Sequence, residues 1–171
     1  MITYYGAHSI DGFIAGPNGE LDWLPQGSRE DDFGYGAFYA TQDVVVMGRK
    51  TWEVSRGFSE WHYGDKDCYV LTRRTGLEAV ANEKFLRFEA GHWQGLSKTK
   101  NIYLNGGGEV ARLFMEHALV DRLELAVVPI ALGLGLPLFA QGFPLTRFRL
   151  TKSSVHPTGL GIKFVWLRLR S

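Results

Sequence analysis

Three short segments of the chain each follow directly after a run of apolar residues that favours a β-strand. They are Gly48-Arg49-Lys50-Thr51, Thr72-Arg73-Arg74 and Asn105-Gly106-Gly107-Gly108-Glu109. Segments that follow parallel strands emerge at one edge of a sheet, and open α/β sheets bind their ligands at that edge. The sequence therefore predicts that two basic clusters and a glycine run meet, an arrangement that suits a ligand with several phosphate groups.

The rest of the pattern alternates strands with helices. Apolar runs predict strands over residues 2–8, 44–47, 68–71, 85–88, 102–104 and 123–128. Helical spacing predicts a helix over 109–119, and weaker signals place helices at 29–40 and 51–54, while 10–15 reads as a strand or an extended loop. Residues 148–155 and 162–169 flank a turn and read as an antiparallel hairpin. We therefore expect an α/β fold of three layers, with a mostly parallel central sheet, flanking helices and a C-terminal antiparallel hairpin.

Composition limits the classes of function. The 171 residues show no linker-like segment, so we expect a single domain over residues 1–171. A net charge of +1 gives no long-range field for nucleic acid or an anionic membrane, and the apolar runs are too short to span a bilayer. With no secretory signal and one cysteine, Cys68, the expected location is the cytoplasm.

The three segments carry groups that bind anions. Glycines let a backbone approach a ligand closely, and a helix start supplies unpaired N–H groups. Arginine offers a planar fork for phosphate, and lysine a mobile charge. Each segment also has a reading without a ligand: a tight turn for the glycines, and solvated surface charge for the two basic clusters.

Acidic residues precede the helix expected at 29–40. Glu30, Asp31 and Asp32 complement a helix dipole, which is a sufficient structural reason for them. The alternative gives one carboxylate a place in a cleft lined by aromatic side chains, where it would hold a nitrogen of a heterocycle. The aromatic side chains concerned are Trp23, Phe33 and Tyr35. The five histidines and single cysteine form no metal-ligand spacing, so no metal site is expected.

Taken in order, these motifs resemble the dihydrofolate reductase superfamily, and especially its branch related to the reductase domain of the bacterial bifunctional riboflavin-biosynthesis deaminase-reductase. The resemblance covers nearly the whole chain. It rests on the segments 9–15, 19–24, 46–53, 70–73, 104–109, 119–123, 129–130 and 133–139.

The resemblance implies an NADPH-dependent reductase acting on a small-molecule substrate. The cofactor phosphates would be held by Gly48, Arg49, Lys50 and Thr51, and the 2′-phosphate by Thr72, Arg73 and Arg74. The diphosphate would lie against the segment Asn105, Gly106, Gly107, Gly108, Glu109. It also implies a cis peptide at Gly106-Gly107, a catalytic or substrate-positioning role for Asp32, and a homodimer.

Two departures bear on the substrate. The riboflavin branch usually has Glu before the glycines, where this chain has Asn105, and Gly48 to Thr51 is closer to folate reductases. Segments 9–15 and 132–139 resemble the riboflavin branch. The expected substrate is a ribosylamino-pyrimidine or another heterocycle; the alternatives are reduction of a pterin such as dihydrofolate, and a nucleotide-binding module without catalysis.

Overall fold

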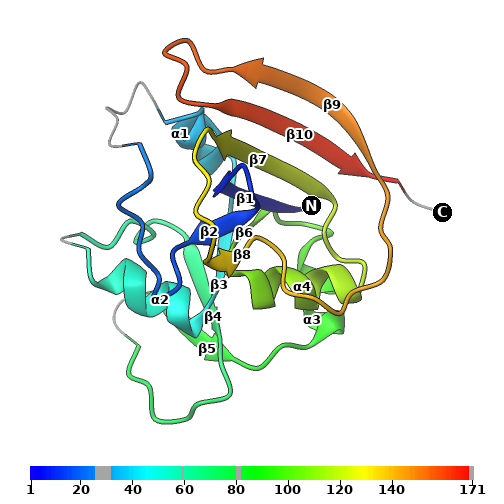
Figure 1. The fold of residues 1–171 in the computed structure, drawn as a ribbon. Coiled ribbons are helices and arrows are strands. Elements are labelled where there is room, and N and C mark those ends of the chain that lie inside the picture. Colours follow the sequence, from blue (N-terminus) through cyan, green and yellow to red (C-terminus); the bar gives the residue numbers. More distant parts are fainter. Residues whose placement is uncertain (26–31, 59, 80–81, 170–171) are drawn as a thin grey trace.

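An eight-stranded mixed sheet organises the protein in the computed structural model, which describes residues 1–25, 32–58, 60–79 and 82–169 (Figure 1). The strands are β1 (Ile2–Ser9), β2 (Phe13–Ala15), β3 (Val44–Gly48), β4 (Asp67–Leu71), β5 (Glu83–Leu86), β6 (Ile102–Gly106), β7 (Arg122–Val128), β8 (Leu136–Pro137), β9 (Phe148–Val155) and β10 (Ile162–Arg168). The helices are α1 (Tyr35–Ala40), α2 (Arg49–Arg56), α3 (Ala90–Leu96) and α4 (Gly108–Glu116).

The order of strands in the sheet is β5-β4-β3-β6-β1-β7-β10-β9. Neighbours from β5 to β7 run parallel, whereas β10 is antiparallel to both β7 and β9. The short strands β2 and β8 form a separate antiparallel ribbon. The mostly parallel sheet and the C-terminal hairpin expected from the sequence are thus confirmed.

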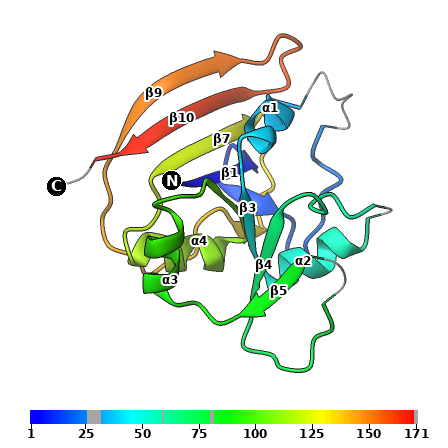
Figure 2. The same cartoon turned by 180° about the vertical axis from the view of Figure 1, so that it is seen from behind.

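Helices cover both faces of the sheet. Trp93 of α3 and Phe114 of α4 are fully buried in one hydrophobic core, while Phe38 of α1 and Trp52 of α2 belong to a second core on the other face. Figure 2 shows the two helix pairs on opposite sides of β3 and β4. The residues from Val44 to Met47 are at most 1% exposed, because a strand covered on both faces is apolar throughout. The three-layer architecture is confirmed.

Two helices differ from expectation. The helix expected at 29–40 begins only at Tyr35, after a turn in which Phe33 and Gly34 both have positive φ; residues 29–31 lie outside the described part of the chain. Helix α3 was not expected, since Gly91 and Gly95 lower its intrinsic propensity. Burial of Trp93 between the sheet and α4 supplies the stabilisation that propensity lacks.

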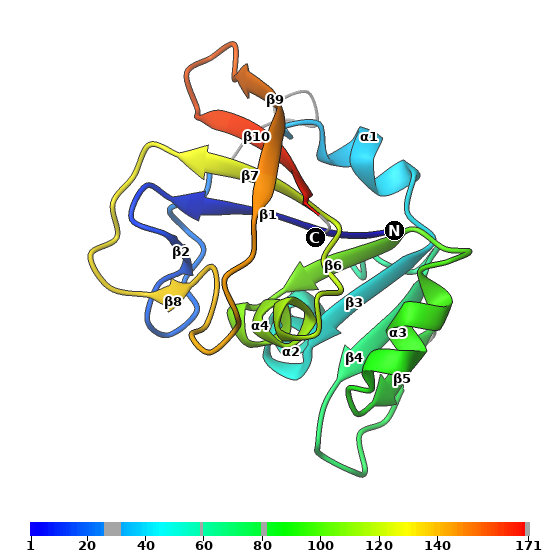
Figure 3. The same ribbon diagram turned by 90° about the vertical axis from the view of Figure 1, so that its right-hand side faces the viewer.

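The arrowheads of β1, β3, β6 and β7 point to the same side of the molecule, at the left of Figure 3. The ribbon of β2 and β8 also lies at this carboxyl edge. Among the described residues, no helix is long and apolar enough to cross a membrane.

Candidate functional site

The structure brings the three segments singled out in the sequence to one edge of the sheet. They follow β3, β4 and β6, and β3 lies between the other two strands. Gly48 is paired with Leu71, and Met47 with Gly106. Since neighbouring strands lie about 4.8 Å apart, the three segments leave the sheet side by side.

Two helices begin at this edge without side-chain caps. Helix α2 starts at Arg49 and α4 at Gly108, and the residues that precede them, Gly48 and Gly107, have no side chain that could cap the first turn. The first N–H groups of a helix have no partner within the helix and carry a partial positive charge. The edge therefore presents two sets of N–H donors suited to an anion.

The three glycines of the run stand in different backbone conformations and surroundings. Gly106 has φ of 100°, which disfavours any side chain, and a Cβ on Gly108 would lie 2.4 Å from the carbonyl oxygen of Pro137. At Gly107 φ is −74°, and a Cβ would make only ordinary contacts, at 3.6 Å with Ile14 and 3.7 Å with Thr51. Backbone conformation thus explains Gly106 and packing explains Gly108, whereas neither requires a glycine at 107, which is half-buried beside Thr51. The Gly106–Gly107 peptide bond is cis, as the resemblance implied.

The basic residues differ in how firmly they are held. Arg49 forms an ion pair with Glu53 one turn along α2. Lys50, Arg73 and Arg74 are exposed, and within the described ranges none of them forms an ion pair. The hydroxyl of Thr72 accepts the N–H of Arg74 at 3.0 Å and so shapes the turn after β4. The free cations are those best placed to receive a phosphate.

The ends of the glycine segment use their side chains elsewhere. The Asn105 amide accepts the hydroxyl of Tyr103 at 2.7 Å and donates to that of Tyr63 at 2.9 Å. The Glu109 carboxylate is 77% exposed and pairs with Arg112. An anion at this edge would therefore meet the backbone of Glu109 rather than its like-charged side chain.

Asp32 lies at the start of α1 and binds its backbone. One carboxylate oxygen accepts the N–H of Gly34 at 2.6 Å, and the other accepts that of Gly36 at 2.7 Å. These contacts account for an acid here on structural grounds alone. Each oxygen still has a second lone pair for another donor. Glu30 and Asp31 lie outside the described residues.

The three predicted aromatic residues do not form one group. Tyr35 packs against Tyr5 and Tyr103, with ring centroids 5.5 and 6.0 Å away, whereas Phe33 lies against His156 at 4.6 Å. Trp23 donates its indole N–H to the carbonyl of Glu20, and no ring contact or hydrogen bond of the described residues joins it to the other two.

Sequence reasoning identified Tyr35 but missed its partners Tyr63 and Tyr103, which complete a tyrosine cluster beside Asn105. Tyr35, Tyr63 and Tyr103 come from α1, a loop and β6, and their hydroxyl groups interact with one another. Burial is the main reason that the pKa of each lies above its ordinary value, so the hydroxyls keep their protons. The positions are scattered along the chain and follow no motif, so no sequence signal could have identified Tyr63 and Tyr103.

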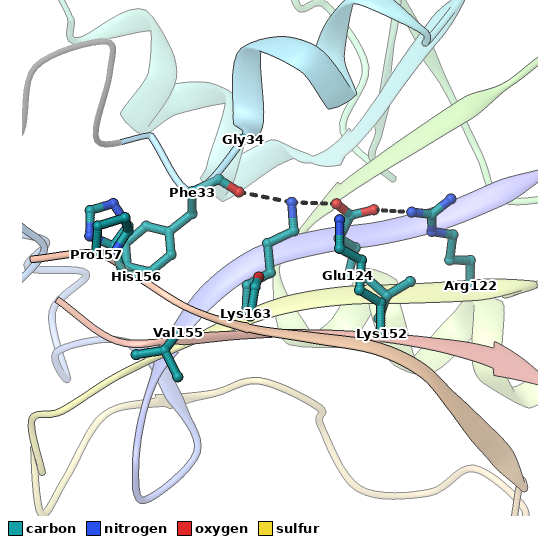
Figure 4. A pocket seen from close by; sticks show the side chains of 11 residues that line it. Phe33, Gly34, Arg122, Glu124, Lys152, Val155, His156, Pro157 and Lys163 are labelled. Atoms are coloured by element: carbon teal, nitrogen blue, oxygen red, sulfur yellow. Dashed lines mark hydrogen bonds and ion pairs between the residues drawn. The ribbon is translucent and has the colours of Figure 1, made fainter. Parts of the chain in front are cut away.

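Lys163 and Glu124 were also missed. The ammonium group of Lys163 donates to the carbonyl of Phe33 at 2.8 Å and forms an ion pair with Glu124 (Figure 4). The Tyr5 hydroxyl donates to the same carbonyl at 3.3 Å. The C-terminal hairpin thus anchors the turn that carries Asp32.

Asp11 joins the two segments that resemble the riboflavin branch. Its carboxylate accepts the hydroxyl of Ser9 and the N–H groups of Leu132 and Gly133, the latter at 2.7 Å. The hydrogen bond from Ser9, followed by that from Gly133, lowers the pKa of Asp11 from 3.8 to about 2. The loop held in this way continues to Pro137, which packs against Gly108, so Asp11 supports the glycine run indirectly.

The chain is similar to known proteins both in sequence and in structure. The RibD C-terminal domain family matches residues 95–162. The uncharacterized protein YwjB of Bacillus subtilis (strain 168) is 35% identical over 150 residues, which cover 85% of this chain and 86% of YwjB. A crystal structure of a putative riboflavin biosynthesis protein from Shewanella sp. PV-4 is 26% identical, covers 99% of both chains and superposes with a TM-score of 0.87.

A more distant structure is that of a diaminohydroxyphosphoribosylaminopyrimidine deaminase/5-amino-6-(5-phosphoribosylamino)uracil reductase from Thermotoga maritima. It is 13% identical with a TM-score of 0.74, and the alignment covers 99% of this chain and 56% of that one. At this identity the likeness concerns the fold alone.

Proposed function

The chain belongs to the RibD C-terminal domain family, and on that premise we propose that it is an NADPH-dependent reductase of the riboflavin-pathway type. Its substrate would be a ribosylamino-pyrimidine or a related heterocycle that accepts hydride at a C=N or imine-like carbon. The observation that carries the proposal is the meeting of two basic segments and the glycine run at one sheet edge, where two helices start.

The residues present fit this cofactor. The N–H groups at the starts of α2 and α4 would bind the diphosphate, with Thr51 beside Gly107. Arg73 and Arg74 are exposed and free to hold the 2′-phosphate that distinguishes NADPH from NADH. When bound, the nicotinamide supplies the hydride, and the protein supplies orientation and electrostatics.

The substrate would lie on the α1 side of the same edge. Asp32 would accept an N–H of the heterocycle with a lone pair that α1 does not use, which fixes the ring in the cleft. Tyr35, whose hydroxyl remains protonated, would lie beside it as a donor. We also propose that the chain forms a homodimer.

The direct test is calorimetric titration with NADPH in a buffer without phosphate. We expect saturable binding at one site per chain; absence of heat and of any change in nicotinamide fluorescence would refute the proposal.

A second test addresses the choice between NADPH and NADH. Replacing both Arg73 and Arg74 with Ala removes charge-assisted phosphate contacts worth about 1.5–3 kcal/mol each. The affinity for NADPH should therefore fall at least tenfold more than the affinity for NADH. The matched control is Lys98→Ala, an exposed lysine at the end of α3, which should leave both affinities unchanged. Equal losses for the two nucleotides would contradict the assignment.

One observation favours a second candidate, a nucleotide-binding module without catalysis. Both oxygens of Asp32 already bind the backbone of α1, which is the pattern of a purely structural acid. Asp32→Ser keeps a capping oxygen and removes the charge. If NADPH binds but neither the protein nor this variant oxidises it with a panel of pterins and ribosylamino-pyrimidines, the binding module is the better description.

A further inference from the structure

A groove runs between α1 and the strands β7, β10 and β9, away from the three anion-binding segments. It comprises two overlapping hollows of about 360 and 380 Å³. Both are lined by Gly34, Arg122, Glu124, Lys152 and Lys163. No residue of the three segments lines either hollow, so the groove is separate from the proposed cofactor site.

Charges in the groove do not balance. Strand register places Glu124, Val165 and Lys152 side by side on β7, β10 and β9, with Lys163 two residues from Val165 on the same face. Glu124 is 5% exposed and pairs with both Lys163 and Arg122, the latter at 2.6 Å. Two cations thus share one buried carboxylate, and the exposed Lys152 adds a third.

No other acid of the described residues restores the balance. Glu124 is the one carboxylate that lines either hollow. The nearest acid in sequence, Asp121, accepts the N–H of Ile2, and Asp32 is bound to α1. The side chains of the lining therefore carry a net charge of about +2 at neutral pH, which favours an anion.

Two lining residues also carry buried polar atoms without hydrogen bonds. These are Nε of Arg122, a donor, and Oε1 of Gln42, an acceptor on a side chain that belongs to a residue only 6% exposed. Buried polar atoms are normally paired, so these two are exceptions among the residues that line the groove.

We propose that this groove binds a small phosphorylated molecule, with its phosphate between Arg122 and Lys152. The two side chains line the groove from β7 and β9, the strands on either side of β10 (Figure 4). Arginine matches the geometry of phosphate oxygens, and lysine adds a mobile charge. Each hollow is large enough for a small molecule. At the other end Phe33 and Pro157 form an apolar wall for the unphosphorylated part of the ligand.

The test uses pyrophosphate as the probe and begins with the unaltered protein. In a ¹⁵N-labelled sample without phosphate buffer, titration should shift the resonances of Arg122, Lys152 and Lys163 along a saturable curve. A second set of shifts at residues 48–51, 72–74 and 106–108 reports the proposed cofactor edge separately. The two sets of resonances therefore test the groove proposal and the reductase proposal separately. Shifts confined to the second set would refute the proposal that the groove binds a phosphorylated molecule.

A variant makes the assignment quantitative. Lys152→Gln removes one cation from an exposed position on β9 and leaves the Glu124 pairs in place. Pyrophosphate affinity measured from the groove resonances should fall about tenfold, the usual effect of losing one charge-assisted contact. NADPH affinity should not change. The control Lys98→Gln, at the end of α3, should leave both unchanged. An unaltered groove affinity in Lys152→Gln would refute the proposal.

Discussion

At the residue scale, the glycine run shows how one motif combines packing and ligand binding. Its position after a strand and before a helix was predictable, because glycines between an apolar run and a helical pattern indicate such a turn. The separate reasons were not. The clash at Gly108 depends on the carbonyl of Pro137, 29 residues further along the chain, which only the folded structure brings there.

The packing role of Gly108 can be measured. Gly108→Ala should lower the free energy of unfolding by about 1–3 kcal/mol, because the added methyl group meets a backbone carbonyl that cannot rotate away. The control is Gly91→Ala in α3, where a Cβ meets nothing within 4 Å. This substitution should raise the free energy of unfolding by about 0.5–1 kcal/mol, because it removes the penalty of a glycine within a helix. Urea unfolding measures both. A Gly108→Ala variant as stable as the wild type would contradict the packing explanation.

At the element scale, strands were predicted better than helices. Continuous apolar runs such as 44–47 and 102–104 mark buried parallel strands directly. Helices α1 and α3 are short and contain glycine, so their existence depends on the burial of Phe38 and Trp93 in the two cores. The same holds for the candidate site. The three segments after strands meet at one sheet edge, as the sequence predicted, whereas the tyrosine cluster and Lys163 depend on contacts between distant elements.

The loop held by Asp11 gives a prediction about pH. In the folded protein the pKa of Asp11 is lowered from 3.8 to about 2. The ionised carboxylate therefore stabilises the fold fully at a pH above 3.8, the pKa in the unfolded chain, and this stabilisation is lost as the pH falls toward 2. Between about pH 5 and pH 2, the wild type should therefore lose more stability than Asp11→Asn. Asp22→Asn, at an exposed position, is the control and should behave like the wild type. Parallel pH profiles for the wild type and Asp11→Asn would rule out this role.

At the scale of the whole molecule, the sheet ends in the edge strand β9, whose residues after Phe148 are all exposed. The register puts Leu150 and Val155 on one face with Ile162, and these side chains are 50%, 70% and 38% exposed. A long exposed edge with apolar side chains favours pairing with another strand. With the family resemblance, this supports the proposed homodimer through β9.

Light scattering should accordingly give about twice the 19.2 kDa of one chain. Val155→Lys places a charge on the exposed face of β9 and should shift the equilibrium toward the monomer. Leu145→Lys, at a side chain that is 79% exposed but outside the sheet, is the matched control. A wild type that remains monomeric at high protein concentration would exclude the dimer.

The bond between Lys163 and the carbonyl of Phe33 has a consequence for biosynthesis. The two residues are 130 positions apart, so this bond, unlike the one from Tyr5 to the same carbonyl, forms only after residue 163 has left the ribosome. A nascent chain that already contains every strand up to β7 would still lack the Lys163 bond, and the turn that carries Asp32 would be held less firmly until β10 has formed.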